Sequence, residues 1–167
     1  MSRFIAYLRA INVGGHVVKM DQLKILFQQL ELANVETFIA SGNVIFDSPA
    51  RSADKLERKI EDHLGNALGY AVATFLRTTA ENVTAAAHEP FAAVRYKASS
   101  RLYAAFLKTA PTAAQSKALL AFKTEIDEFV IHDRELYWLC HVPSHESAFS
   151  AARAEKTLGA PITMRNI

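Results

Sequence analysis

Residues 35–46 have the sequence Val-Glu-Thr-Phe-Ile-Ala-Ser-Gly-Asn-Val-Ile-Phe, which carries the clearest structural signal in the chain. β-Branched and aromatic residues dominate 35–40 and 44–46, which is typical of strands. The intervening Ser41-Gly42-Asn43 indicates a tight turn, because Gly42 can adopt the positive φ that such a turn needs. The stretch is therefore predicted to be a β-hairpin.

A helix and a strand are predicted on each side of this hairpin. Before it, residues 3–11 are almost continuously apolar, which indicates a strand buried on both faces, and residues 20–30 carry apolar side chains at helical spacing. After it, Ser52 is the expected N-cap of a helix that ends near Gly69, and residues 70–77 are predicted to form a strand. The order β-α-β-β-α-β is that of a ferredoxin-like unit.

The second half of the chain repeats this order of elements. The predicted elements are a strand over 101–108, a helix after Pro111 with Thr112 and Gln115 as its capping box, strands over 129–132 and 136–142 joined at Asp133-Arg134, a helix from Ser147 to Gly159, and a strand over 162–164. The prediction is an α+β protein with ferredoxin-like units at 1–78 and 101–167, joined by a helix and connector over 79–100. Since the first strand of each half is apolar on both faces, the two units are expected to pack into one globular body.

Composition excludes several classes of protein. With 167 residues, 50% of them hydrophobic and 22% charged, the chain can bury enough apolar surface to fold. The net charge of +2 is too small to indicate a nucleic-acid or anionic-membrane partner by itself. Cys140 is the only cysteine, so an intrachain disulfide and a multi-cysteine zinc site are excluded. A cytoplasmic protein without a membrane span, metal or cofactor is expected.

The predicted topology brings two distant segments to one edge of the first sheet. Because strands one and three are antiparallel neighbours in such a unit, the segment after the first strand should meet the hairpin turn. The residues concerned are Arg9, Asn12, Gly14, Gly15 and Lys19 on one side and Ser41, Gly42 and Asn43 on the other. Consecutive glycines let a ligand approach the backbone, the following helix N-terminus favours anions, and the first twenty residues contain no acid. The edge is therefore a candidate anion site.

The glycine pair does not match an established phosphate-loop motif, so the ordinary alternative is a plain turn beside a solvated Arg9. His16, next to Gly15, could act as a general acid or base at such a site. No partner carboxylate is identifiable from the sequence, which favours an ordinary loop histidine.

Four stretches have a familiar order and spacing: Arg9-Ala10-Ile11-Asn12-Val13-Gly14-Gly15, Lys19-Met20 with Leu23, residues 37–46, and Thr163-Met164-Arg165-Asn166. Together they resemble the bacterial family catalogued as domain of unknown function 1697. Members of that family usually have glycine where this chain has Ala10. The resemblance implies a doubled ferredoxin-like fold, adds Arg165 and Asn166 to the candidate site residues, and implies no particular reaction.

Two other groups of residues have alternative interpretations. Cys140, His141 and His145 invite a metal or thiol function, but strand alternation and Pro143 separate them, which favours a buried cysteine and surface histidines. Between residues 90 and 124 there is no acid, and the basic residues there are Arg95, Lys97, Arg101, Lys108, Lys117 and Lys123. Such a stretch forms a solvated face or follows the phosphates of a nucleic acid.

The sequence therefore supports a leading hypothesis and two alternatives. The first is binding of a small anionic ligand, a nucleotide or a phosphorylated metabolite, at the predicted edge. The others are a nucleic-acid-binding module that uses residues 95–123, and an oligomerising structural protein without a ligand. Whether the protein catalyses a reaction, and with which residues, stays open.

Overall fold

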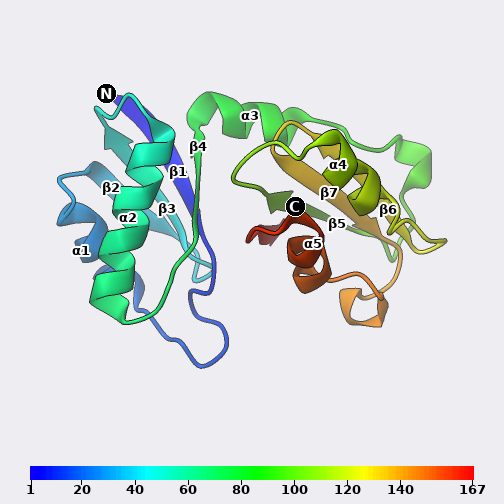
Figure 1. The fold of residues 1–167 in the computed structure, drawn as a ribbon, viewed down its shortest axis with the longest axis horizontal. Helices are drawn as coiled ribbons and strands as arrows, with labels where there is room; N and C mark the ends of the chain where they lie inside the picture. The colour runs from blue at the N-terminus through cyan, green and yellow to red at the C-terminus, as the bar shows by residue number, and fades with distance from the viewer. The chain divides into compact units, whose positions relative to one another are not determined.

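A computed structural model describes residues 1–167, and the chain forms two units, Met1–Ala86 and Ala87–Ile167. The elements of the first unit are β1 (Ser2–Leu8), α1 (Met20–Gln28), β2 (Ala33–Phe38), β3 (Asn43–Ser48), α2 (Ala53–Leu68), β4 (Thr74–Thr78) and α3 (Thr79–Ala87), whose last residue is the first of the second unit. Its strands form one antiparallel sheet in the order β2-β3-β1-β4 (Figure 1).

Helices α1 and α2 cover one face of this sheet and bury its apolar side chains. Strand β1 contributes alternate residues to this core, Phe4, Ala6 and Leu8, as expected for a strand with one face against helices. Phe27 of α1 and Ile60 of α2 pack against them and are fully buried. This core holds β1 and β3 in register, so the segments that follow β1 and precede β3 are brought together.

The second predicted strand is shorter than the sequence pattern suggested. It was predicted to continue to residue 40, but β2 ends at Phe38, because Ile39 has a φ of 52° and leaves the extended conformation. The strand predicted over 70–77 begins only at Thr74. Strand β3 is longer than predicted and starts at Asn43, which pairs with Phe38. The hairpin prediction is confirmed, with Gly42 at a φ of 82°.

The second unit has the elements η1 (Ala93–Arg95), β5 (Arg101–Phe106), α4 (Ala113–Leu120), β6 (Asp127–His132), β7 (Glu135–Cys140), η2 (Ser144–Glu146), α5 (Ala151–Leu158) and β8 (Thr163–Asn166). Its strands form a second antiparallel sheet in the order β6-β7-β5-β8. The core of this unit includes Leu119, Trp138 and Phe149.

Most predicted helix ends are confirmed, because they depend on contacts within one turn. The Ser52 hydroxyl accepts the amide hydrogen of Lys55, and Thr112 forms a full capping box with Gln115. Gly69 ends α2 at a φ of 80°.

The predicted start of the last helix at Ser147 is wrong. The Ser147 hydroxyl donates to the buried Asp127 carboxylate, and Phe149 enters the core of the second unit. Helix α5 therefore begins at Ala151 with Ser150 as its N-cap, whereas its predicted end at Gly159 is confirmed at a φ of 67°.

Candidate functional site

The segment that follows β1 meets the hairpin turn between β2 and β3. The Leu8 amide donates to the Gly42 carbonyl at 2.9 Å, and the Asn12 side-chain amide donates to the Ala40 carbonyl at 2.9 Å. A methyl group on Gly42 would lie 2.9 Å from the Ile11 Cβ, so only glycine allows this approach. We call residues 9–19 and 39–42 together the loop edge.

Left-handed backbone is concentrated in the loop edge. The residues with positive φ there are Ala10, Asn12, Gly14, Gly15, Ile39 and Gly42. A β-branched residue such as Ile39 rarely adopts this conformation, and strained residues of this kind occur often at binding sites. A Cβ on Gly14 or Gly15 would meet nothing within 4 Å, so these glycines serve the backbone conformation rather than close packing.

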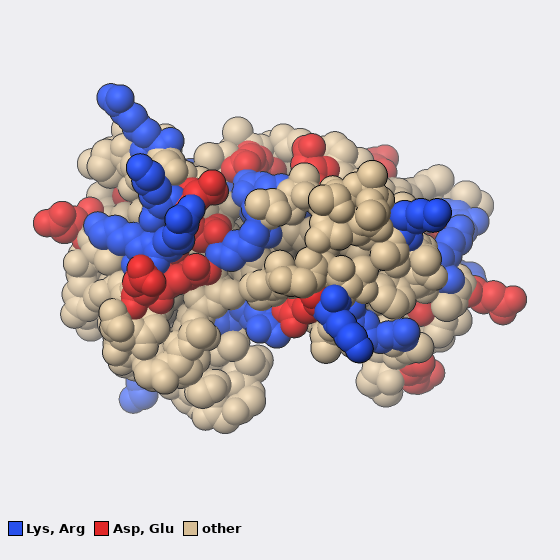
Figure 2. All heavy atoms as spheres, viewed as in Figure 1, with Lys and Arg blue, Asp and Glu red and all other residues tan.

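The loop edge also exposes large apolar side chains. Val17 is 82% exposed, and Val13 and Ile39 are each 57% exposed; Phe38, the neighbouring last residue of β2, is 60% exposed. In Figure 2 the lobe at the lower left, where the dark-blue loop after β1 lies in Figure 1, carries no Asp or Glu on the face shown. The loop edge thus combines apolar surface with an absence of negative charge, which suits a ligand that has an apolar part and an anionic part.

The candidate residues with polar side chains have different positions in the loop edge. Arg9, Lys19 and Ser41 are exposed, and Lys19 immediately precedes α1. The Arg9 backbone amide donates to the Ala73 carbonyl at 2.9 Å, which fixes the start of the loop beside the segment that leads into β4. The exposed side chains are therefore placed where a ligand on the loop edge could reach them.

The two asparagines of the candidate set hold the loops in place. The Asn12 amide group donates to Ala40, and its carbonyl accepts the Val18 amide hydrogen at 2.7 Å. Asn43 is buried and donates to the Phe38 carbonyl and the Ser41 hydroxyl. The sequence predicted that both asparagines belong to a ligand site, but these hydrogen bonds are to the loops themselves, so the two side chains shape the loop edge.

His16 lies against Tyr70, an arrangement that the sequence did not reveal. The two rings stack with their centroids 3.8 Å apart and their planes at 22°. The Tyr70 hydroxyl is buried without a hydrogen-bond partner, and burial raises its pKa. A buried hydroxyl without a partner costs free energy, so a ligand that reached it would gain a hydrogen bond.

Arg165 and Asn166 belong to the second unit. They lie in β8, where Arg165 pairs with Ala104 and Asn166 with Tyr103. The Arg165 guanidinium donates to the Thr163 hydroxyl and the Met164 carbonyl. Both residues are therefore part of the second sheet rather than of an irregular C-terminal tail.

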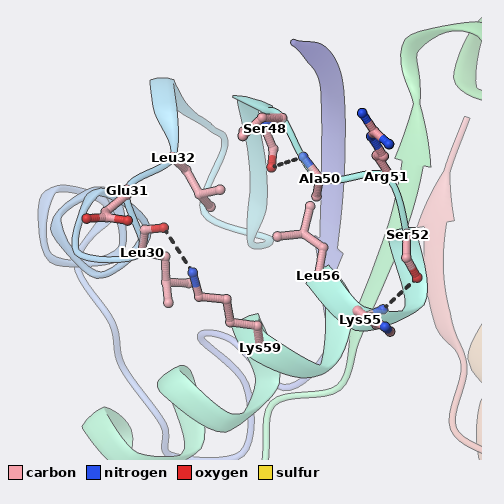
Figure 3. A pocket seen from close by; sticks show the side chains of 11 residues that line it. Leu30, Glu31, Leu32, Ser48, Ala50, Arg51, Ser52, Lys55, Leu56 and Lys59 are labelled. Atoms are coloured by element: carbon pink, nitrogen blue, oxygen red, sulfur yellow. Dashed lines mark hydrogen bonds between the residues drawn. The ribbon is translucent and has the colours of Figure 1, made fainter.

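A hollow that the sequence analysis missed lies at the other end of β3. It has a volume of about 470 Å³ and lies between the end of α1 and the start of α2. Figure 3 shows Leu32 and Leu56 pointing toward each other across it, while the Arg51 guanidinium points away. Lys59 spans its lower side and donates to the Leu30 carbonyl at 3.5 Å. Basic residues at 51, 55 and 59, spaced four apart, were the available signal.

The environment of Cys140 and His141 differs in part from the expectation. Cys140 is buried, as expected, and burial raises its pKa. His141 was expected at the surface, but it is only 6% exposed. Its two ring nitrogens lie within hydrogen-bond distance of Ser100 and Glu128, and these partners make its burial tolerable.

With two four-stranded antiparallel sheets and five α-helices, the chain is a mixed α+β protein, and none of its helices is long and apolar enough to span a bilayer. The chain belongs to the DUF1697 family of proteins of unknown function, whose model matches residues 1–137. It is similar in fold to the conserved bacterial protein SP0830 from Streptococcus pneumoniae, with 23% identity and a TM-score of 0.76. That similarity covers 99% of this chain and 92% of the other. The search of curated proteins found no match to this chain.

Proposed function

We propose that the first unit binds a small anionic ligand, a nucleotide or another phosphorylated metabolite, at the loop edge. The observation that carries this proposal is that the strained loop after β1, with its exposed Gly14 and Gly15, meets the hairpin turn beside basic and apolar side chains. Glycine backbone lets an anion come close to amide hydrogens, and a basic residue before a helix adds to the favourable potential at its N-terminus.

Each part of the loop edge has a separate role in this proposal. The backbone of Gly14 and Gly15 and the charges of Arg9 and Lys19 receive the anionic group. Exposed apolar side chains such as Val17 contact the apolar part of the ligand. Ser41, Gly42, Asn12 and Asn43 keep the two loops together. Arg165 and Asn166 are carried into the proposal by the family resemblance alone.

The arrangement of each unit and the location of the protein are also inferences. We infer that both units are ferredoxin-like, supported by their element order and by antiparallel sheets whose central strands are the first and third. A cytoplasmic location is supported by the single buried Cys140, since secreted chains of this size often rely on disulfides.

A thermal-shift titration with nucleotides, sugar phosphates and inorganic phosphate tests the function. A ligand that binds only the folded protein raises its Tm in a concentration-dependent way. Lys19→Ala should weaken the apparent affinity about tenfold, the effect of losing about 1.4 kcal/mol. Lys24→Ala removes an exposed charge from α1 and serves as the matched control. The proposal fails if no compound shifts the Tm, or if both substitutions weaken binding equally.

A further inference from the structure

Three side chains form a hydrogen-bonded triad in the second unit, whereas the loop edge belongs to the first unit. Ser100 lies immediately before β5, Glu128 lies in β6, and His141 follows β7. The Ser100 Oγ lies 2.7 Å from Nδ1 of His141, and the His141 Nε2 lies 2.9 Å from Oε1 of Glu128. His141 and Glu128 are buried, whereas Ser100 is partly exposed.

The neighbouring groups determine which atoms of this triad carry protons. A hydrogen bond from Arg95 holds the pKa of Glu128 below its ordinary value, against the raising effect of burial. An ionised Glu128 can only accept, so in the neutral imidazole of His141 the hydrogen lies on Nε2 and the lone pair on Nδ1. The Ser100 Oγ already accepts the Lys97 amide hydrogen at 2.8 Å, so its own hydrogen is available for that lone pair.

The base and its carboxylate are held rigidly. The Arg95 guanidinium binds the Oε2 of Glu128, which leaves the Oε1 directed at His141. The His141 backbone is held on both sides, because its amide donates to the Ile126 carbonyl and its carbonyl accepts the Ser99 hydroxyl. A nucleophile in contact with a base, which a third group orients, is the arrangement that activates serine for acyl transfer.

We propose that Ser100 is a nucleophile that His141 activates and Glu128 and Arg95 position, and that it takes the acyl group of a small carboxylic ester. The connector over residues 92–99 is exposed throughout, so a small acyl group can approach Ser100 from solvent. The Lys97 amide donates to the Ser100 Oγ, and this bond fixes the hydroxyl in front of the His141 ring.

The reaction proceeds in two balanced steps. The Ser100 Oγ forms a bond to the carbonyl carbon as its proton passes to the His141 Nδ1. The ester C–O bond then breaks, and that proton leaves with the alcohol. In the second step water, deprotonated by the same nitrogen, attacks the acyl-serine, the carboxylic acid departs, and Ser100 recovers its proton.

Acylation of the full chain tests this proposal. p-Nitrophenyl acetate should release one equivalent of nitrophenol in an initial burst, and intact mass should increase by one acetyl group that peptide mapping places on Ser100. A fluorophosphonate should label the same residue. Ser100→Ala should abolish both signals, whereas Ser144→Ala should retain them, because Ser144 is an exposed serine of η2 that contacts none of the proposed residues.

His141→Gln tests activation rather than mere exposure. It should slow acylation at least about a hundredfold, the usual contribution of a general base. If that variant does not fold by circular dichroism, Ser100→Cys and Ser99→Cys are compared instead, and the thiol at position 100 should be alkylated by iodoacetamide at least tenfold faster. The proposal is overturned if the native chain is not acylated, if Ser100→Ala is acylated equally, or if folded His141→Gln reacts at the native rate. Equal alkylation of the two thiols also overturns it.

Discussion

Ile39 has an unfavourable backbone conformation that its own side chain does not offset. A left-handed conformation costs an L-residue about 1–2 kcal/mol, and the cost is real here because Ile39 is β-branched with a φ of 52°. Its side chain is 57% exposed, so little burial compensates. The residue keeps this conformation because the pairing of Phe38 with Asn43 forces the turn to close within four residues.

Replacing Ile39 with glycine should therefore stabilise the protein. Ile39→Gly is expected to raise the free energy of unfolding by about 0.5–1 kcal/mol, the relief of strain less the extra backbone entropy that glycine loses. It should also weaken any ligand-dependent rise in Tm, because the turn becomes less ordered. Urea denaturation measures the first effect. Val17→Gly, which removes another exposed β-branched side chain where φ is not positive, should destabilise instead. Destabilisation by Ile39→Gly would contradict the strain argument.

Several elements of the second unit are joined through Glu128. Its carboxylate binds Arg95 at the end of η1 and His141 just after β7, while its own backbone lies in β6. The pKa of Glu128 is lower in the folded protein than its ordinary value of 4.5, chiefly because of the Arg95 hydrogen bond. The ionised carboxylate therefore stabilises the folded state above about pH 4.5, and this contribution is lost as the pH falls through the folded-state pKa.

Glu128→Gln should accordingly destabilise the protein by about 1–3 kcal/mol at pH 7, since buried partners lose a charged acceptor. The difference from the native chain should shrink as the pH is lowered below 4.5 and the native carboxylate becomes neutral. Chemical denaturation followed by Trp138 fluorescence at several pH values measures this, because Trp138 is the only tryptophan and lies in this unit. Glu125→Gln, at an exposed position before β6, should have no comparable effect. A difference that does not change with pH would exclude the ionisation argument.

The whole molecule has nearly balanced charge, with 19 basic and 17 acidic residues. Figure 2 shows blue and red side chains interspersed over the face in view. Within the basic stretch 95–123, Arg95 is paired with Glu128. Nucleic-acid affinity comes largely from basic side chains that replace the counterions around phosphates. A surface of mixed charge, on which Arg95 already pairs with a carboxylate, therefore attracts a polyanion only weakly.

We therefore expect only non-specific binding of a twelve-nucleotide single strand, with a Kd of about 10 µM or weaker at 150 mM salt. Fluorescence anisotropy at several salt concentrations measures it. A submicromolar Kd with a steep salt dependence, lost in a Lys97→Ala and Arg101→Ala double variant, would favour the nucleic-acid alternative instead.

Elements whose signals are local could be predicted from the amino-acid sequence. The hairpin turn at Gly42 and the caps at Ser52, Thr112 and Gly159 depend on residues within a few positions, so the residue types there predict them. The meeting of the loop after β1 with the hairpin turn also followed, because antiparallel pairing of the first and third strands permits no other placement.

Other features depend on contacts between residues that are far apart in the sequence. Ile39 leaves β2 although its residue type favours a strand, because the closing pairs of the hairpin override local propensity. Ser147 does not begin α5, because its hydroxyl donates a hydrogen bond to Asp127, twenty positions earlier. Ser100, Glu128 and His141 have no shared sequence pattern, since Ser100 precedes β5, Glu128 lies in β6 and His141 follows β7, and they meet only when the second sheet forms. Contacts between distant residues depend on how strands pair, and no local residue pattern encodes them.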